Sequence, residues 1–580
     1  MFELEETQEL LLSHPLVPAG PIPTASDPEG VYPYESFAET SRRPVLKKFR
    51  MVTIGNDHIR VKICPDLGGR VCSILLRRPG VETLFDPRVV RPVRILPRHS
   101  YIGGGIEVSF PISHTPVQIV PVLYEVKEQG DRLYIACGER ELRFGMHWTV
   151  EYSVGAAEAF LTQRTVFFNP DRSGHPWMSW SNAGVPAHPD TEFHFPAGPV
   201  LAHGREMRTI DWNADGPRRQ ADVRQMTGYF WRNPDCCAFG AFTPSLGAGL
   251  YHVADPSVTP GIKLWSDGVG RDEVWVSQYT LNRQQCVEIQ AGPLIDQSVK
   301  DMLQPGRERH HVEFWIPSAI ARDIRSISLP APQLRDLRNV PRFGWARTEE
   351  VCLWMAVVSA WQSGQASCLP AAPDLDDNRW AVSGITELGA ALSWAATATE
   401  GCQRGRWLFQ LGAWLAGRDQ ISAALETLGS SCDDRARALA GCLWRRQMNN
   451  AEAAARSFRA IESDALALHP QIVVERDKAL AALGRATLSE RGRWLDAVSA
   501  LEDEWVAERR ASFLIDSGDP KSACEILQST PFQLVHQRYA RTRLWRDVEK
   551  HLAMEPVEYP AWLGEDDLAE FGAYREYAED

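Results

Sequence analysis

The sequence lacks the features that would place it at a membrane or on a nucleic acid. No apolar run approaches the roughly 18 residues of a transmembrane helix. The start, MFELEETQELLLSHP, is acidic and has neither the basic segment nor the sustained apolar stretch of a signal peptide. Acidic residues outnumber basic ones, 75 to 62, and the net charge of -13 disfavours nucleic acid or a lipid surface as partner. We therefore expect a cytoplasmic protein with a neutral or polar ligand.

Metal and cofactor motifs are also missing. The 12 cysteines are scattered, with one adjacent pair, Cys236 and Cys237, and no C-x-x-C spacing. This disfavours a zinc site of the common kind and suits a reducing compartment. There is no H-E-x-x-H and no calcium loop, and the glycines at 103–105 are not followed by the helix of a dinucleotide fingerprint. We expect neither a metal nor a cofactor.

The chain changes its pattern near residue 320. From 46 to 320, short runs of β-branched and aromatic residues alternate with Gly, Pro, Asn and Asp, without helical patterns between them. This is typical of a large antiparallel β-sandwich. Residues 321–345 carry three prolines and read as a linker, and from 346 to 580 the apolar spacing becomes three and four, as in helices. Residues 1–45 are assigned to an N-terminal extension.

The helical region contains three helix–turn–helix patterns. They turn at residues 417–419, at 448–450 and at 517–520, where Gly518 suits a helix C-cap and Pro520 a first helical position. Such pairs resemble tetratricopeptide-type repeats, which stack on neighbours because one unit cannot bury its apolar face alone. Two interpretations stay open: a domain that packs against the β half, or a surface for binding and for homo-oligomer formation.

Five segments of the β half together resemble one known family. In chain order they are CPDLGGRVCSILLR, GGGIEVSFPISHTPVQ, WSNAGV, VEIQAGPLIDQS and VEFWIP. They are similar to the domain of unknown function 5107, which belongs to the aldose 1-epimerase, or galactose mutarotase-like, superfamily. The resemblance covers about residues 45–320. It implies a twisted β-sandwich that holds a mono- or oligosaccharide over one concave sheet.

Glu288 is the first candidate catalytic residue. In the resembled superfamily a Glu-x-Gln on a late strand carries the catalytic base, and Glu288 with Gln290 matches it. Strand alternation puts both side chains on the face opposite Val287 and Ile289. A carboxylate in a cleft can take a proton from a sugar hydroxyl or activate a water. The alternative is a solvated surface glutamate.

The proton donor of mutarotases is not where the resemblance would place it. Anchored on Asn182, the position of the family's histidine falls on Met178, which has no proton to give. Three other histidines stay open as donors: His114, His175 and His188.

Two further carboxylates could act with Glu288. Glu107 lies on a predicted strand in YIGGGIEVSFPISH, and Glu313 shares a strand face with His311 and Trp315 in HHVEFWIP. Glycoside hydrolases use two carboxyl groups as their catalytic residues. The 20 tryptophans include candidates for stacking on sugar rings. The expected substrate-binding residues are Arg70, His114, His175, Trp180, Asn182, Trp265, Gln290 and His311.

Three functions are compatible with these residues. The missing histidine and the candidate carboxylates favour a glycoside hydrolase, with Glu288 paired to Glu107 or Glu313. An aldose 1-epimerase with Glu288 as base and a displaced histidine as acid is the second. A non-catalytic sugar-binding module on a helical scaffold is the third.

Overall fold

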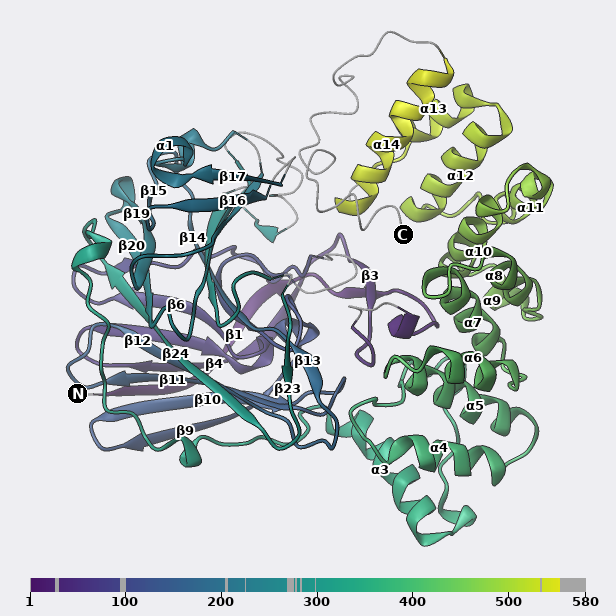
Figure 1. Ribbon diagram of the computed structural model, residues 1–580, viewed down its shortest axis with the longest axis horizontal. Helices are drawn as coiled ribbons and strands as arrows, with labels where there is room; N and C mark the ends of the chain where they lie inside the picture. The colour runs from purple at the N-terminus through teal and green to yellow at the C-terminus, as the bar shows by residue number, and fades with distance from the viewer. Residues whose placement is uncertain are drawn as a thin grey trace.

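A β-rich half and a helical half lie side by side (Figure 1). The computed structural model describes residues 2–26, 31–93, 101–203, 207–224, 226–268, 276, 279–281, 284–297, 299–532 and 535–552. The last strand ends at Ser318 and the first long helix begins at Thr348. The predicted β-sandwich followed by a helical region is therefore confirmed.

Two antiparallel sheets form the β half. Among the described residues the larger sheet has 12 strands. In spatial order they are β1 (Glu3–Ser13), β4 (Val45–Gly55), β5 (Ile59–Cys64), β6 (Arg70–Leu76), β8 (Gly105–Ser109), β14 (Trp180–Pro186), β22 (Cys286–Gly292), β21 (Gly261–Ser266), β18 (Thr227–Trp231), β16 (Pro199–His203) and β17 (Met207–Asp211), with β7 (Val81–Glu82) beside β6.

The smaller sheet packs against the larger one. Its order is β15 (Glu192–His194), β19 (Ala238–Thr243), β20 (Ala248–Ala254), β24 (Glu308–Ser318), β12 (Leu161–Phe168), β11 (His147–Gly155), β10 (Arg132–Arg140) and β9 (Leu123–Gln129). Two short pairs complete the strands: β2 (Leu16–Pro18) with β3 (Phe37–Thr40), and β13 (His175–Trp177) with β23 (Asp301–Leu303). A single helical turn, α1 (Trp212–Asp215), follows β17.

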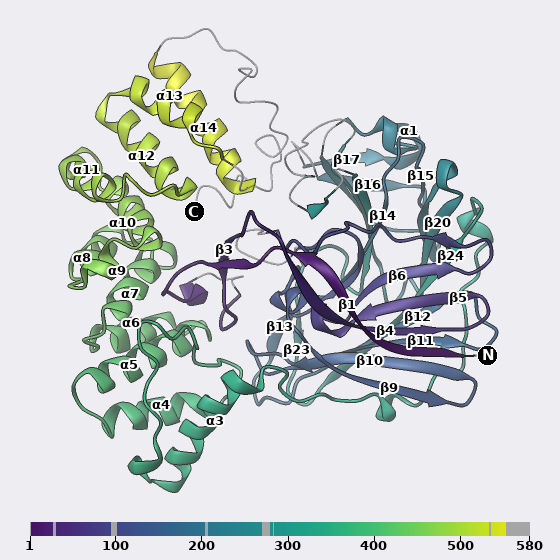
Figure 2. The same cartoon turned by 180° about the vertical axis from the view of Figure 1, so that it is seen from behind.

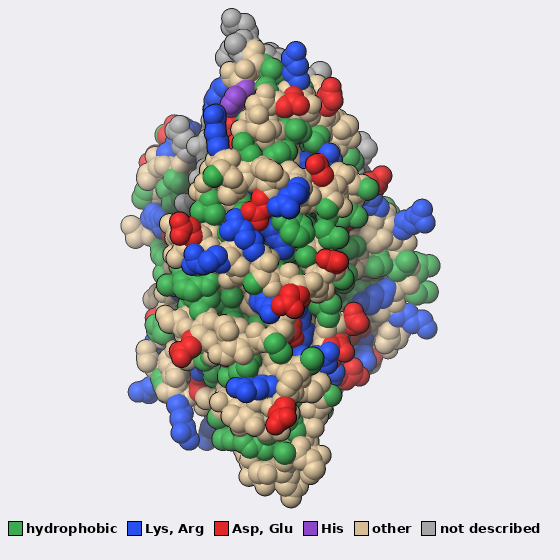
Figure 3. Space-filling model, turned by 90° about the vertical axis from the view of Figure 1, so that its right-hand side faces the viewer, with side chains coloured by type: hydrophobic (Ala, Val, Ile, Leu, Met, Phe, Trp, Pro, Cys, Tyr) green, Lys and Arg blue, Asp and Glu red, His purple; other side chains and the backbone are tan. Residues whose placement is uncertain are grey.

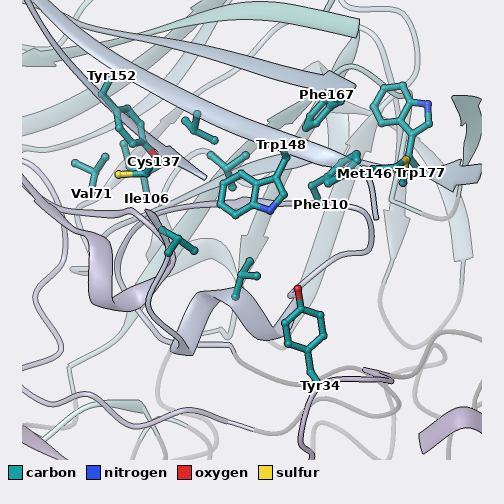
Figure 4. Packing of buried hydrophobic residues seen from close by; sticks show 14 of the residues in the cluster. Tyr34, Val71, Ile106, Phe110, Cys137, Met146, Trp148, Tyr152, Phe167 and Trp177 are labelled. Carbon is teal, nitrogen blue, oxygen red and sulfur yellow. The ribbon is translucent and has the colours of Figure 1, made fainter. Parts of the chain in front are cut away.

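Alternating apolar residues fill the space between the two sheets. Val71 and Ile106 of the larger sheet lie beside Cys137 and Tyr152 of the smaller one (Figure 4). All four are nearly or completely buried. Because Glu107 alternates with Ile106 along β8, its side chain points to the other face of the larger sheet.

The N-terminal residues belong to the sandwich and also reach the helical half. Strand β1 pairs with β4 along its whole length, so the assignment of residues 1–45 to an extension missed a strand. Beyond β2, an arm around Ile22 and Tyr32 packs on the helices (Figures 1 and 2). The hydroxyl of Tyr32 donates to the carbonyl of Ala381 at 2.6 Å, and Gly417 leaves room for the tyrosine ring.

The helical half consists of antiparallel hairpins. Its helices are α3 (Thr348–Ser363), α4 (Leu388–Thr397), α5 (Gly401–Ala416), α6 (Ile421–Gly429), α7 (Asp434–Arg446), α8 (Ala451–Arg459), α9 (Asp464–Ala467), α10 (Pro470–Ala482), α11 (Leu488–Ala497), α12 (Glu504–Ser517), α13 (Pro520–Ser529) and α14 (Val535–His551). The three predicted hairpins are α5–α6, α7–α8 and α12–α13. Gly518 caps α12 in the left-handed conformation, with φ of 88°, and Pro520 opens α13.

Basic and acidic side chains are interspersed over the outer side of the helical half (Figure 3). The segment between β24 and α3 lies along the smaller sheet, where Thr149 donates to the carbonyl of Pro341 at 2.7 Å. Among the described residues, no helix combines the length and the apolar character needed to cross a membrane.

Candidate functional site

A row of polar side chains crosses the central strands of the larger sheet. Glu107, Asn182, Gln290 and Lys263 lie directly opposite one another on β8, β14, β22 and β21. Directly paired residues of antiparallel strands share a face, so the four side chains stand in one line. All four are buried. Their neighbours along the strands enter the core on the opposite face: Ile106, Ala183, Ile289 and Leu264.

Glu288 stands in the next row of the same face. It lies opposite Gly184 on β14 and Trp265 on β21. The amide of Gln290 donates a hydrogen bond to Oε2 of Glu288 at 2.8 Å. Within the described part of the chain, no basic side chain forms an ion pair with this carboxylate. Glu288 is therefore a hydrogen-bonded carboxylate that no cation of the described chain neutralises.

The three consecutive glycines carry the backbone across β14 next to Glu288. A Cβ on Gly184 would lie 2.6 Å from the Cα of Gly104, so neither side has room for a side chain. Gly104 and Gly105 have φ values of 75° and 64°, which glycine adopts readily. The flexible entry to β8 is thus a packing requirement, because the loop crosses the strand that carries Asn182.

Both carboxylate oxygens of Glu107 are engaged. Arg70 donates from Nη2 to Oε2 at 2.8 Å and also donates to the carbonyl of Gly104. Nδ1 of His114 lies 2.8 Å from Oε1, although the two groups lack hydrogen-bond alignment. Burial raises the pKa of Glu107, but His114 and Arg70 together lower it below its ordinary value. Glu107 is therefore an anion at neutral pH.

His114 is held in a backbone conformation that is rare for residues other than glycine. Its φ is 52°, in the left-handed region, and its backbone N–H donates to Oγ of Ser109 at 3.1 Å. The imidazole lies edge-on to the ring of Tyr101, with 5.6 Å between centroids. Its side chain is 14% exposed, against 1% for Glu107. Of this pair, the imidazole is the group that can reach a ligand.

The two predicted stacking tryptophans differ in their surroundings. Trp180 is only 1% exposed, and its indole lies over Gly261 and Gly292. Trp180 fills a small apolar core at the edge of the site. The expectation that its indole stacks on a sugar ring is therefore wrong. Trp265 is partly exposed, and its indole N–H donates to Asp267 at 3.1 Å. Trp265 lies directly opposite Glu288 on the neighbouring strand and stays the candidate for stacking on a sugar ring.

The structure places Glu313 and His311 outside this site. Glu313 is fully buried on β24 and accepts a hydrogen bond from the hydroxyl of Ser181 at 2.7 Å. Ser181 precedes Asn182 on β14, so its side chain points to the opposite face, between the two sheets. The expectation that Glu313 faces Glu288 across one cleft is therefore corrected.

Glu313 is the centre of a polar cluster inside the sandwich. Gln163 donates to Oε2 at 2.7 Å, and the imidazoles of His252 and His311 lie 3.0 and 3.3 Å from the carboxylate. Burial alone raises the pKa of Glu313, but the two histidines lower it to about 2. This arrangement stabilises a buried anion and offers no proton at neutral pH.

The other two candidate histidines also lie elsewhere. Nε2 of His175 is 2.7 Å from the carboxylate of Asp171, which also pairs with Arg418 of the helical half at 3.3 Å. His175 thus belongs to the contact between the halves. Nδ1 of His188 lies 3.1 Å from the hydroxyl of Ser245.

Lys263 is a functional candidate that the sequence analysis missed. Its ammonium donates to Gln297 at 2.7 Å, and Gln297 in turn donates to Gln290 at 2.7 Å. The signal was present in GIKLWSD, because strand alternation puts Lys263 on the same face as Trp265. Among the described residues, no group of three or more His, Cys, Asp or Glu side chains is arranged to hold a metal ion.

Fold and site together define a β-sandwich protein with a polar sheet face, joined to a tetratricopeptide-like helical domain. The chain belongs to the family of the domain of unknown function DUF5107, whose model matches residues 26–318. A second family model, described as a C-terminal domain, matches residues 354–548.

Solved structures similar to the chain fall into two groups. A TPR-domain containing protein from Parabacteroides distasonis ATCC 8503 is 48% identical over 98% of each chain, with a TM-score of 0.93. A galactose mutarotase-like protein from Clostridium acetobutylicum is 13% identical, covering 47% of this chain and 95% of that one, with a TM-score of 0.35. A galactose mutarotase related enzyme from Lactobacillus acidophilus is 14% identical, covering 48% and 100%, with a TM-score of 0.34.

Proposed function

We propose that the protein is a carbohydrate-active enzyme that acts at the anomeric carbon of a sugar. The observation that carries the proposal is Glu288: a carboxylate with no cationic partner among the described residues, on a face of hydrogen-bonding side chains and opposite the partly exposed Trp265. Amides such as those of Asn182 and Gln290 suit sugar hydroxyls, because each can donate and accept. The side-chain oxygen of Asn182 is buried and has no hydrogen-bond partner in the described structure, so it is available to a ligand.

The reaction favoured by these groups is the interconversion of sugar anomers. Glu288 accepts the proton of the anomeric hydroxyl while the bond between the anomeric carbon and the ring oxygen breaks. Protonated His114 gives its proton to that ring oxygen, which produces the open-chain aldehyde. Rotation about the bond beside the aldehyde carbon and reversal of both transfers yield the other anomer. The carboxylate of Glu107, 2.8 Å from Nδ1 of His114, keeps the imidazole beside the ring.

The strand geometry leaves room for a single sugar ring between Glu288 and the pair formed by Glu107 and His114. Glu107 and Glu288 are separated by two strand spacings and by two residues along the strands. With about 4.8 Å per spacing and about 3.4 Å per residue, their Cα atoms lie about 12 Å apart. Side chains that extend toward each other from such positions leave room for one six-membered ring.

Glycoside hydrolysis is the second candidate, and the same separation favours it. Inverting glycosidases place their two carboxyl groups about 6.5–9.5 Å apart, which Cα atoms about 12 Å apart allow. The ionised Glu107 would then activate the water, and Glu288 would protonate the leaving oxygen. The ion pair of Glu107 with Arg70 makes this assignment less favourable, because a paired carboxylate is a weaker base.

Two measurements on the purified protein separate these functions. Polarimetry on freshly dissolved α-D-glucose and α-D-galactose should show anomer exchange above the buffer rate. Glu288→Gln should reduce this rate by a factor of roughly 10²–10⁴, the usual worth of a general base. Glu128→Gln, at an exposed residue of β9, is the matched control and should change nothing. Release of sugar from oligosaccharides without anomer exchange would favour hydrolysis, and sugar binding without either reaction would refute an enzymatic role.

A further inference from the structure

Strand β1 leaves one backbone edge of the larger sheet open. One of its edges pairs with β4 from Glu3 to Ser13. Among the described residues, its other edge is paired at Ser13 alone, by an isolated bridge to Val90. The N-terminal end of β1 lies on the side of the sandwich away from the described helices (Figures 1 and 2). An open edge of this kind is a template for the pairing of another strand.

The contact with Val90 shows which backbone groups face the open edge. The carbonyl of Leu12 accepts from the N–H of Val90 at 2.8 Å, and the N–H of His14 donates to the carbonyl of Val90 at 3.0 Å. Successive residues direct their backbone groups to alternate edges of a strand, and β1 pairs with β4 without a register shift. The outward groups on the open part of β1 therefore belong to Leu4, Glu6, Gln8 and Leu10.

The side chains of these four residues are exposed and follow a symmetrical order. Leu4 is 52% exposed and Leu10 is 57% exposed. The exposed Glu6 and Gln8 lie between them. Read from either end, the order is one apolar residue, two polar residues and one apolar residue. Such an order is complementary to itself when a second copy of the strand runs antiparallel.

We propose that a second copy of this chain pairs with β1, antiparallel and about a two-fold axis at Thr7. Leu4 then lies opposite Leu10 of the partner subunit, and Glu6 lies opposite Gln8 of the partner subunit, whose amide donates to the carboxylate. The four pairs exchange about eight backbone hydrogen bonds, two for each pair. The larger sheets of the two copies become one continuous sheet. This interface lies several strands away from β22, so it does not depend on the role of Glu288.

The neighbouring registers are less favourable. An axis at Glu6 puts this carboxylate directly opposite its own copy, and like charges in that position are destabilising. An axis at Gln8 requires the carbonyl of Leu12, which already accepts from Val90. The axis at Thr7 avoids both conflicts and pairs each exposed leucine with a leucine.

The acidic side chains of β1 are compatible with this pairing. Three of its four glutamates form ion pairs within their own chain: Glu3 with Arg77, Glu5 with Arg60 at 3.2 Å, and Glu9 with Lys62 at 2.7 Å. The fourth, Glu6, gains a cation from the other copy. Arg50 is exposed and lies directly opposite Gln8 on β4, so it stands in one row with Glu6 of the partner subunit. Two strand spacings, about 10 Å, separate these positions, and the two long side chains span that distance. Opposite charges thus face each other across the interface.

Sedimentation velocity on the full-length protein at about 10 μM tests the pairing, because a dimer of micromolar Kd is mostly formed there. The unaltered protein should sediment as a species of twice the 65.0 kDa of one chain. Gln8→Pro removes an N–H that faces the open edge and keeps the hydrogen bonds to β4, so it should be a monomer with an unchanged circular dichroism spectrum. A monomeric unaltered protein overturns the proposal. A dimer that survives Gln8→Pro also overturns it, because its contact then lies elsewhere, as on the helical half.

Cysteine trapping gives a second readout, which depends on the register. At the axis, Thr7 forms a non-hydrogen-bonded pair with Thr7 of the partner subunit, and the Cα separation of about 4.5 Å in such a pair permits a disulfide. Thr7→Cys treated with oxidised glutathione should give a disulfide-linked dimer. Thr209→Cys, at an exposed threonine of the opposite edge strand β17, is the matched control and should behave like the unaltered protein. No linked dimer from Thr7→Cys, or as much from Thr209→Cys, overturns the proposal even where Gln8→Pro fails to fold.

Discussion

Replacing Glu139 by Gln should make the stability of the protein less dependent on pH. Glu139 is fully buried on β10, where one carboxylate oxygen accepts from the hydroxyl of Tyr34 at 2.7 Å. Its other oxygen has no hydrogen-bond partner within the described structure. Burial raises the pKa of this carboxyl group to about 8, although the Tyr34 hydrogen bond lowers it, and the neighbouring Glu141 raises it further.

The magnitude follows from linkage between protonation and folding. The pKa is about 8 in the folded protein against an ordinary value of 4.5. At about 1.4 kcal/mol for each tenfold change in proton affinity, the ionised group destabilises the fold by up to about 5 kcal/mol. Below pH 4.5 both states hold the proton and nothing is lost. Between 4.5 and 8 the unfolded state alone ionises, so stability falls as the pH rises, and above 8 the full loss is present.

Denaturant unfolding at about pH 5, 7 and 8.5 measures this effect. Glu139→Gln cannot ionise, so its stability should rise relative to the wild type across this series, by an amount on the order of 4 kcal/mol between the ends. Glu128→Gln, which is exposed, should track the wild type throughout. A stability difference between Glu139→Gln and wild type that is the same at every pH would refute the reasoning.

Two further substitutions test the packing of the fold, and a third tests the buried carboxylate of Glu313. Gly184→Ala puts a methyl group 2.6 Å from the Cα of Gly104, so unfolding experiments should show a loss of about 1–3 kcal/mol, and unchanged stability would contradict the crossing of the loop. Tyr32→Phe leaves the carbonyl of Ala381 without its 2.6 Å donor and should reduce stability by about 1–3 kcal/mol in the same assay, whereas a variant as stable as wild type would count against the docking of the arm. The pKa of Glu313 is lowered to about 2, so its contribution is present above pH 4.5 and is lost as the pH falls through 2. Glu313→Gln should therefore be about 3 kcal/mol less stable than wild type at pH 7 but nearly equal at about pH 2, and a pH-independent difference would disprove this account.

Local patterns were sufficient to predict much of the fold. The change from strand to helix patterns, the three hairpins and the cap at Gly518 follow from residue spacing and turn chemistry, which act over a few residues. Strand alternation also identified the face shared by Glu288 and Gln290, which the structure shows as one polar face.

Long-range contacts explain what the sequence could not reveal. Alternation shows that His311 and Glu313 share a face, but not that this face meets the other sheet, because that depends on Ser181 more than 100 residues away. The partner strand of β1 begins at Val45, beyond two short strands and the arm, so a local reading missed the pairing. The left-handed backbone of His114 is equally invisible in the sequence; in the structure it accompanies the contacts of this residue with Glu107 and Ser109.

The most direct test of the central claim is a crystal structure of the protein with a bound monosaccharide. The account predicts a sugar over the polar face, with its anomeric hydroxyl about 2.6–3.2 Å from the carboxylate of Glu288. His114 should lie on the side of the ring oxygen, and Trp265 should contact the ring. A sugar on this face whose anomeric carbon points away from Glu288, or a face that stays empty while the protein catalyses anomer exchange, would contradict it.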